Sequence, residues 1–266
     1  MTSNDRSFQT RKTILSAIHR ANSPHIASAF SCVEITHALI EVLFTRKTSE
    51  ESPIVENQLV FSKGHAAICL YSALHTYGFI SDEELATFSE NGSHLYGHVS
   101  HLAHPRIALS TGSLGHGLPF AIGLALGMKK LNQSGWVAVV LSDGELNEGT
   151  TWESALIANK FQLDNLICLV DRNRLQSLGD TEQTLPLEPL NSKWYSFGWD
   201  VEVVDGHRLD EIRNSLQLSK KPKVVIANTI KGKGVSWMEN EILWHYRPPS
   251  FDEMEKALIN LTENYQ

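Results

Sequence analysis

The chain has 266 residues, of which 42% are hydrophobic and 20% are charged, a composition typical of a globular protein with a sizeable core. Its formal net charge is −7 and its basic residues form no block, which argues against nucleic acid as a partner. Cys32, Cys69 and Cys168 stand in apolar contexts, so we expect reduced core thiols rather than disulfides or a zinc site. The N-terminus lacks an apolar signal segment and no apolar run is long enough to span a bilayer. We therefore expect a cytoplasmic protein with no membrane partner.

The first half of the chain alternates helical patterns with a short apolar run. Helices follow from hydrophobic periodicity, and strands from short β-branched runs bounded by turn residues. The expected elements, in order, are helices over 10–21 and 32–44, a polar loop over 50–58, a strand over 59–61, a helix over 66–77, a capped helix start at 81–84, and a helix over 118–131. Residues 91–110 are rich in histidine and show little periodicity, which is typical of a functional loop.

The second half repeats a strand–helix pattern. The expected elements are a strand over 136–141, a helix over 147–162, a strand over 166–170, a loop over 176–190, a helix over 191–197, a strand over 201–204, a helix over 208–218, a strand over 223–227, and a helix over 252–264. This alternation predicts an α/β fold with a doubly wound, mainly parallel sheet and helices on both of its faces. We expect a single domain over residues 1–266.

The strand–helix–strand unit at residues 136–173 organises the predicted site. Asp143 follows its first strand and Asn173 its second, and a right-handed crossover would bring both to the carboxyl edge of the sheet. Each residue alone is typical of a turn or a cap, but the pair offers a carboxylate and an amide oxygen, which suit Mg²⁺ bridged to a phosphate. Gly144 allows a phosphate to approach the backbone at a helix N-terminus. The unit therefore predicts a metal-bridged diphosphate.

Two further features point to the same edge. The turn at residues 111–117 contains three glycines before a helix, which permits the close approach of an anion or a cofactor. Four of the 12 histidines lie at junctions between predicted elements, where the chain could return to this edge: His25, His65, His98 and His245. Neutral imidazoles donate and accept hydrogen bonds, so such a cluster suits a polyhydroxylated substrate and proton exchange.

These segments together resemble the thiamine-diphosphate-binding N-terminal part of transketolase. The matching motifs are FSKGHAA, STGSLGHGL, SDGELNEGTTWESA, the DRN at the end of the central unit, and IKGKGVSWMENEILWH. The resemblance extends over most of the chain and is closest to the N-terminal subunits of split bacterial transketolases. It implies a transferase that uses thiamine diphosphate and Mg²⁺ to move a two-carbon ketol unit from a ketose or ketose phosphate to an aldose.

The resemblance also implies roles for individual residues. The metal ligands would be Asp143, Asn173 and the backbone carbonyl of Leu175. The cofactor contacts would be His65, Gly112, Ser113, Leu114, Gly144, Glu145, Asn173 and His245. Catalysis would fall to three histidines, with His98 and His245 transferring protons and His25 mainly orienting the substrate.

The pyrimidine-binding and C-terminal domains of whole transketolases have no counterpart in this sequence, so the resemblance implies a separate C-terminal subunit, in an α₂β₂ assembly. Pro24, His116 and Tyr246 depart from the family pattern near the expected substrate. The donor and the acceptor, sugars or sugar phosphates, therefore stay open between pentose phosphate metabolism and a specialised pathway. Two other functions also stay open: the α subunit of a 2-oxo acid decarboxylating enzyme with the same cofactor, and a non-catalytic cofactor-binding subunit.

Overall fold

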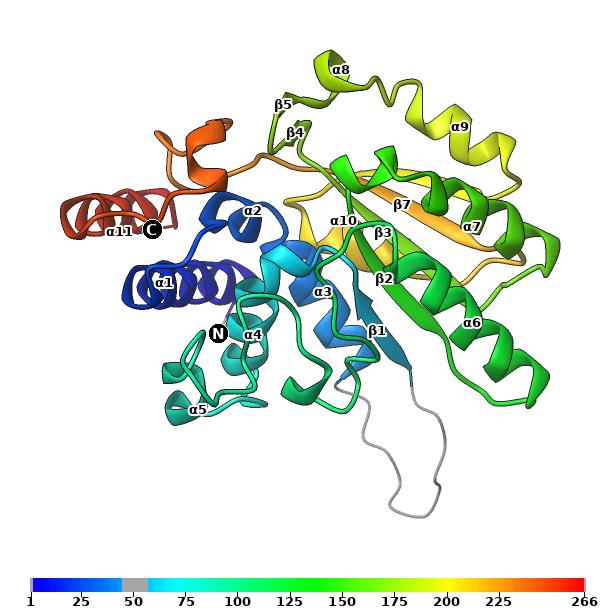
Figure 1. The fold of residues 1–266 in the computed structure, drawn as a ribbon, viewed down its shortest axis with the longest axis horizontal. Coiled ribbons are helices and arrows are strands. Elements are labelled where there is room, and N and C mark those ends of the chain that lie inside the picture. The colour runs from blue at the N-terminus through cyan, green and yellow to red at the C-terminus, as the bar shows by residue number, and fades with distance from the viewer. Residues whose placement is uncertain (1, 45–56, 266) are drawn as a thin grey trace.

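A five-stranded parallel sheet forms the centre of the molecule (Figure 1). The computed structural model describes residues 2–44 and 57–265, so the polar loop expected at 50–58 lies almost entirely outside the described residues. From one edge to the other, the strands are β1 (Gln58–Phe61), β2 (Val137–Ser142), β3 (Leu166–Arg172), β7 (Lys223–Asn228) and β6 (Asp200–Asp205). Every neighbouring pair in this sheet is parallel, which confirms the predicted fold class.

Both faces of the sheet are buried, as expected when strands carry continuous apolar runs. All six residues of β2 are buried, and their side chains alternate between two cores. Ala138 and Val140 belong to one core, whereas Val137, Val139 and Leu141 belong to the other. A helical layer must therefore cover each face.

The helices form these two layers, which lie on opposite sides of the sheet in Figure 1. One layer contains α6 (Gly117–Lys130), α7 (Gly149–Lys160) and α9 (Leu190–Ser196). The other contains α1 (Ser3–Ala21), α2 (Ile26–Ser31), α3 (Val33–Leu43), α4 (Ala67–Thr76), α10 (Leu209–Ser215) and α11 (Phe251–Tyr265). Among the described residues, no helix combines the length and the apolar character needed to cross a membrane.

Short elements shape the loops at the ends of the strands. They are α5 (Asp82–Ala86), α8 (Thr181–Thr184), the antiparallel pair β4 (Leu175–Gln176) and β5 (Gly179–Asp180), and four 3₁₀ turns, η1 (Gly64–Ala66), η2 (His101–Ala103), η3 (Gly144–Asn147) and η4 (Ile242–His245). The segment predicted as a loop at 176–190 thus contains part of a hairpin and a helical turn. The helix expected from residue 147 begins as η3 and continues as α7 only from Gly149.

The first helix is longer than its apolar periodicity predicts. It begins at Ser3 instead of residue 10, because Thr2 and Asp5 form a capping box in which each side chain bonds the other's backbone N–H. The short helix α2 was also not predicted, since its six residues are too few to show a helical period. It begins directly after His25 and so fixes the position of that histidine in the fold.

Candidate functional site

A cavity of about 190 Å³ opens at the carboxyl ends of β1, β2, β3 and β7. Its lining residues are His25, Lys63, His65, His98, Gly112, Leu114, Ser142, Asp143, Gly144, Asn173, Leu175, Gln176, Ser177, Lys231 and His245. A larger cavity of about 650 Å³ lies among α1, α10 and α11, and none of the predicted site residues lines it. The predicted chemistry therefore belongs to the smaller cavity, at the sheet edge where open α/β folds bind ligands.

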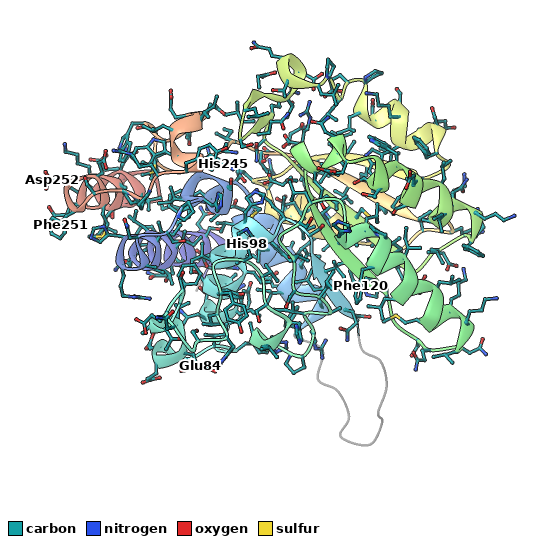
Figure 2. The ribbon with its side chains drawn as sticks, in the orientation of Figure 1. Glu84, His98, Phe120, His245, Phe251 and Asp252 are labelled. Atoms are coloured by element: carbon teal, nitrogen blue, oxygen red, sulfur yellow. The ribbon has the colours of Figure 1, made fainter. Side chains whose placement is uncertain are left out.

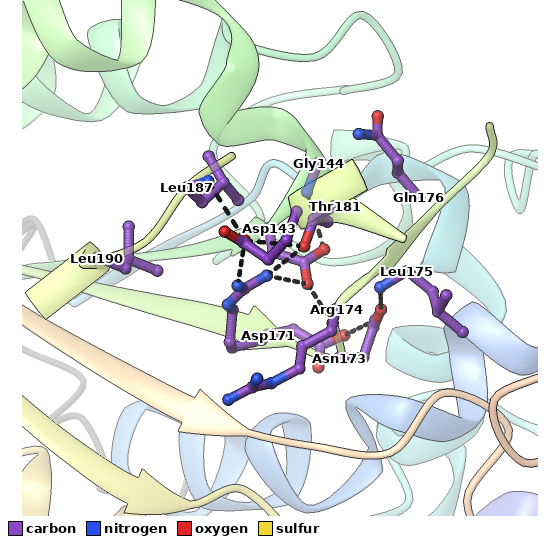
Figure 3. A network of polar contacts seen from close by, with 12 residues as sticks. Asp143, Gly144, Asp171, Asn173, Arg174, Leu175, Gln176, Thr181, Leu187 and Leu190 are labelled. Carbon is purple, nitrogen blue, oxygen red and sulfur yellow. Dashed lines mark hydrogen bonds and ion pairs between the residues drawn. The ribbon is translucent and has the colours of Figure 1, made fainter. Parts of the chain in front are cut away.

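Asp143 and Asn173, 30 positions apart in sequence, meet at this edge (Figure 3). The Asp143 carboxylate is 1% exposed and accepts backbone N–H bonds from Gly144 at 2.8 Å and from Arg174 at 2.5 Å. Burial, and then the nearby Asp171 carboxylate, raise the pKa of Asp143. The Asn173 Oδ1 accepts the Leu175 N–H at 3.1 Å, and Leu175 lines the cavity wall.

A buried ion pair that sequence reasoning missed lies beneath these residues. The Lys63 ammonium, just after β1, donates to the Asp171 carboxylate near the end of β3. Asp171 also accepts from the Ser31 hydroxyl at 2.6 Å and from the Thr229 hydroxyl. Burial alone would raise the pKa of Asp171, but Lys63 and these hydroxyls lower it below its usual value. The pair joins α2, β1, β3 and the segment after β7 under the cavity floor.

Lys231 is a second missed residue, and no ion pair balances its charge within the described residues. It is 1% exposed and donates to the Leu175 carbonyl oxygen at 2.9 Å, and no carboxylate lies within salt-bridge distance of it among the described residues. Burial, and then repulsion from Lys63, lower the pKa of Lys231 to about 8. A buried ammonium in this setting favours an anion in the cavity. Both lysines follow strand ends, the same signal that identified Asp143.

The structure brings all four junction histidines together. The ring centroid of His25 lies 5.3 Å from that of His65, 6.1 Å from that of His98 and 5.0 Å from that of His245. The rings of His65 and His245 are 5.7 Å apart. His25 enters at the start of α2 with a left-handed φ of 76°, held by its N–H bond to the His245 carbonyl at 3.1 Å. Figure 2 shows the places of His98 and His245 in the fold.

Three of these imidazoles are neutral at physiological pH. Burial first, and repulsion from His98 second, lower the pKa of His25 to about 4. Burial, and then Lys231, lower the pKa of His245 to about 3, and burial also lowers the pKa of His65 well below its usual value. The buried Nδ1 of His25 has no hydrogen-bond partner within the described part of the chain. The group can therefore donate to and accept from a polar ligand.

Two predicted cofactor contacts lie outside the lining of the cavity. Ser113 is exposed beside Gly112 and Leu114, which do line it. Glu145 is fully buried, and its carboxylate accepts from the Ser62 hydroxyl, from the Gly115 N–H at 2.9 Å and from the Ser142 N–H at 3.3 Å. In this arrangement Glu145 ties the ends of β1 and β2 to the glycine turn. In the sequence Glu145 stands at the start of a helix, and that position does not indicate that its side chain points into the protein.

The donor set fits a diphosphate beside a hard cation. Within residues 2–44 and 57–265, no three His, Cys, Asp or Glu side chains are placed to hold a metal by themselves. Asp143, the Asn173 amide oxygen and the Leu175 carbonyl instead offer an oxygen-only set that needs further oxygens from a ligand, as Mg²⁺ sites with phosphates do. Lys231 would then meet the remaining negative charge, and the histidines the polar part of the ligand.

Comparisons with known proteins agree with this geometry. The family described as "Transketolase, thiamine diphosphate binding domain" matches residues 5–262. The apulose-4-phosphate transketolase subunits A of Phocaeicola vulgatus and Actinobacillus succinogenes are 35% and 39% identical to this chain, over 98% and 91% of it and over 94% and 90% of their own lengths. A 6-deoxy-6-sulfo-D-fructose transketolase subunit of Clostridium sp. is 36% identical over 94% of this chain and 92% of its own length.

Whole transketolases match over part of their length. The human enzyme is 33% identical over 98% of this chain and 42% of its own length. A crystal structure of transketolase from Campylobacter jejuni superposes with a TM-score of 0.87 at 28% identity, covering 97% of this chain and 42% of that one. The chain thus spans about two fifths of these longer relatives.

The fold and the edge cavity define the class of this protein as a thiamine-diphosphate-binding α/β domain. Within that class the chain belongs to the transketolase family of transferases, as a counterpart of the N-terminal subunits of its two-subunit members. This membership confirms the predicted resemblance.

Proposed function

We propose that residues 1–266 form one cofactor-binding domain of a two-subunit transketolase, which moves a two-carbon ketol unit from a ketose or ketose phosphate to an aldose. The observation that carries this proposal is a cluster of four histidines in the cavity lined by the buried Asp143 and Asn173, in which the ring of His25 lies 5.0 to 6.1 Å from the other three rings. This arrangement places groups for sugar hydroxyls next to groups for a metal and a diphosphate.

Mg²⁺ would be held by Asp143, Asn173 and the Leu175 carbonyl, with Gly144 and Lys231 facing the diphosphate. The oxygen donors and the unbalanced charge of Lys231 support this assignment. Bound thiamine diphosphate supplies the nucleophilic carbon and the electron sink that allow the C2–C3 bond of the donor to break. Cofactor contacts by His65, Gly112, Ser113, Leu114 and Glu145 stay predictions. The indirect position of Glu145 favours a supporting role.

The histidines would move protons and orient hydroxyls. His25 and His245, neutral at pH 7, can each accept a hydrogen bond from one hydroxyl and donate a hydrogen bond to another. His98 lies at the exposed side of the cavity, where a donor sugar would enter. We therefore assign proton transfer to His98 and His245, and orientation of the substrate to His25.

A separate C-terminal subunit would complete the site, in an α₂β₂ assembly. The names of the similar proteins, which are called subunits of transketolases, support a partner. Those three names specify two different unusual ketoses, so the donor of this chain belongs to an open set of plain, branched and modified ketoses. We place the reaction in the cytoplasm, where three unpaired buried cysteines would stay reduced.

The test is ketol transfer with thiamine diphosphate and Mg²⁺, by the chain alone and after addition of its C-terminal partner. Donors would include a ketopentose phosphate, a ketohexose phosphate, a branched ketose phosphate and a sulfonated ketose, with pyruvate as the 2-oxo acid control. Transfer only in the mixture, and only from ketoses, is the expected result. Transfer by the chain alone would contradict the division between subunits, and cofactor binding without turnover in the mixture would support a non-catalytic role.

A further inference from the structure

Arg172, the middle residue of the Asp-Arg-Asn motif, stands behind the cavity rather than in it. Its side chain is 1% exposed at the end of β3, next to the proposed ligand Asn173. Its Nη1 donates to the Asp143 Oδ2 at 3.3 Å, the same oxygen that accepts the Arg174 N–H. The Nη1 group of Arg172 is thus bonded to the carboxylate of Asp143, the proposed metal ligand.

The other contacts of Arg172 hold the segment that follows the motif. Nη1 donates to the Thr181 hydroxyl at 2.7 Å, and Nη2 donates to the carboxylates of Glu182 at 2.7 Å and Glu188 at 3.0 Å. Those carboxylates in turn accept backbone N–H groups from Leu187, Glu188 and Leu190. The guanidinium is therefore the centre of a network that folds residues 181–190 over the end of β3.

The residues between the motif and this network form a wall of the cavity. Leu175, Gln176 and Ser177 line it, and the Thr181 N–H bonds the Arg174 carbonyl at 2.9 Å, which closes the hairpin of β4 and β5. Removal of Arg172 would free Glu182 and Glu188 to turn to solvent, since both are partly exposed. It would leave Asp143 buried without its cation, in a carboxylate whose burial already opposes charge.

We propose that Arg172 is a positioning residue for the cofactor site: it joins the cavity wall at residues 175–177 and the carboxylate of Asp143 into one rigid unit. Arg172 is not among the residues that line the cavity. It acts through Asp143 on one side and through Thr181, Glu182 and Glu188 on the other. This inference rests on the proposed cofactor site and adds a residue that supports the ligands from behind.

The test combines two readouts on the full chain. Arg172→Met should raise the Kd for thiamine diphosphate, measured by calorimetry in excess Mg²⁺, by about tenfold, the usual cost of removing a group that supports a metal ligand. Hydrogen exchange of the amides at residues 174–190 should become faster in the ligand-free chain. Arg172→Lys keeps the positive charge, but one ammonium cannot bond Asp143 and the two glutamates at the same time. This variant should therefore restore only part of the affinity.

Two further variants keep the test decisive. Glu182→Gln with Glu188→Gln loosens the network from its partly exposed side, and it should reproduce faster exchange and weaker binding even if Arg172→Met does not fold. Arg6→Met removes an ion pair between α1 and α3 with Glu41, away from the cavity, and should leave the Kd unchanged. Unchanged exchange at 174–190 in the foldable variants would overturn the inference. Failure of the wild-type chain to bind thiamine diphosphate, alone and with its partner, would instead overturn the proposed cofactor site.

Discussion

At the scale of single residues, the cavity floor has fixed charges before any ligand arrives. Lys63 neutralises Asp171, and Arg172 touches Asp143, but Lys231 has only a carbonyl oxygen as its partner among the described residues. The floor is preorganised for an anion, because burial has already removed water from the Lys231 ammonium and a diphosphate entering beside it would meet an unsolvated positive charge.

Asp143→Asn tests the metal assignment. We expect the Mg²⁺ concentration for half-saturation with thiamine diphosphate to rise by at least about tenfold, as for loss of groups in a metal site. Calorimetric titration measures this shift. Asp164→Asn, at a solvent-exposed pair with Lys129, is the matched control and should bind as the wild type does. Wild-type affinity in Asp143→Asn would remove this residue from the ligand set.

His98→Ala and His245→Ala test the proton-transfer roles. Each should lower the turnover of the reconstituted complex by about a hundredfold or more, in the range of general acid–base contributions. Steady-state ketol transfer at saturating cofactor measures this loss. His75→Ala replaces a histidine that bonds Asp82 on the surface and should leave turnover unchanged. If both site variants turn over normally, the non-catalytic function becomes the better description.

At the scale of elements, the site depends on loops pressed together at the ends of strands. A Cβ on Gly64, in the 3₁₀ turn η1, would lie 2.7 Å from the Thr111 backbone and 2.8 Å from that of Gly112. The Gly64 carbonyl also accepts the Val99 N–H at 3.2 Å, which brings the histidine-rich loop against η1. Glycine at this position therefore lets the turn that precedes α6 reach the cavity.

Gly64→Ala tests this contact between loops. The added methyl must displace backbone at Thr111, so we expect a lower Tm and weaker binding of thiamine diphosphate. Gly123→Ala, within α6, is the matched control because a Cβ there meets nothing within 4 Å. That variant should be more stable by about 0.5–1 kcal/mol, since alanine restricts the unfolded chain and favours helix. Thermal unfolding and calorimetry on both variants check the pair, and tolerance of Gly64→Ala would show that the loops are free to separate.

At the scale of the whole molecule, one edge of the sheet gathers segments from the entire chain. His25 and His245 lie 220 positions apart and are hydrogen-bonded through their backbones. Folding buries both imidazoles next to Lys231 and Lys63, so the site carries a cost for any proton that binds there. The stability of the fold is therefore linked to pH through the titration of His25 and His245.

This linkage predicts a loss of stability in acid. The pKa values of His25, about 4, and His245, about 3, lie below their ordinary value of 6.5, so the unfolded chain binds more protons than the folded one in this window. The contribution is fully present above pH 6.5 and is lost as the pH falls from there towards 4. Tm measured from pH 7.5 to 4.5 should fall, and His245→Gln should flatten the fall while His75→Gln should not. Equal slopes in all three proteins would contradict a buried neutral His245.

The sequence by itself determined the elements and the edge at which they meet. The apolar runs of β2 and β3 and the right-handed crossover between them are local signals, and they sufficed to pair Asp143 with Asn173. Junction positions likewise sufficed to select the four histidines. The shared location of these residues could be predicted because periodicity and strand ends depend on neighbouring residues alone.

Only the tertiary structure decided the electrostatics and the supporting contacts. The pairing of Lys63 with Asp171, the unbalanced charge of Lys231 and the inward direction of Glu145 join residues up to 108 positions apart. The segment at 176–190 has the sequence of a polar loop, and only the structure shows that its residues Glu182 and Glu188 are held by the Arg172 guanidinium. The physical reason is that burial and through-space partners set the charge state and the direction of a side chain, and neither leaves a periodic trace in the sequence.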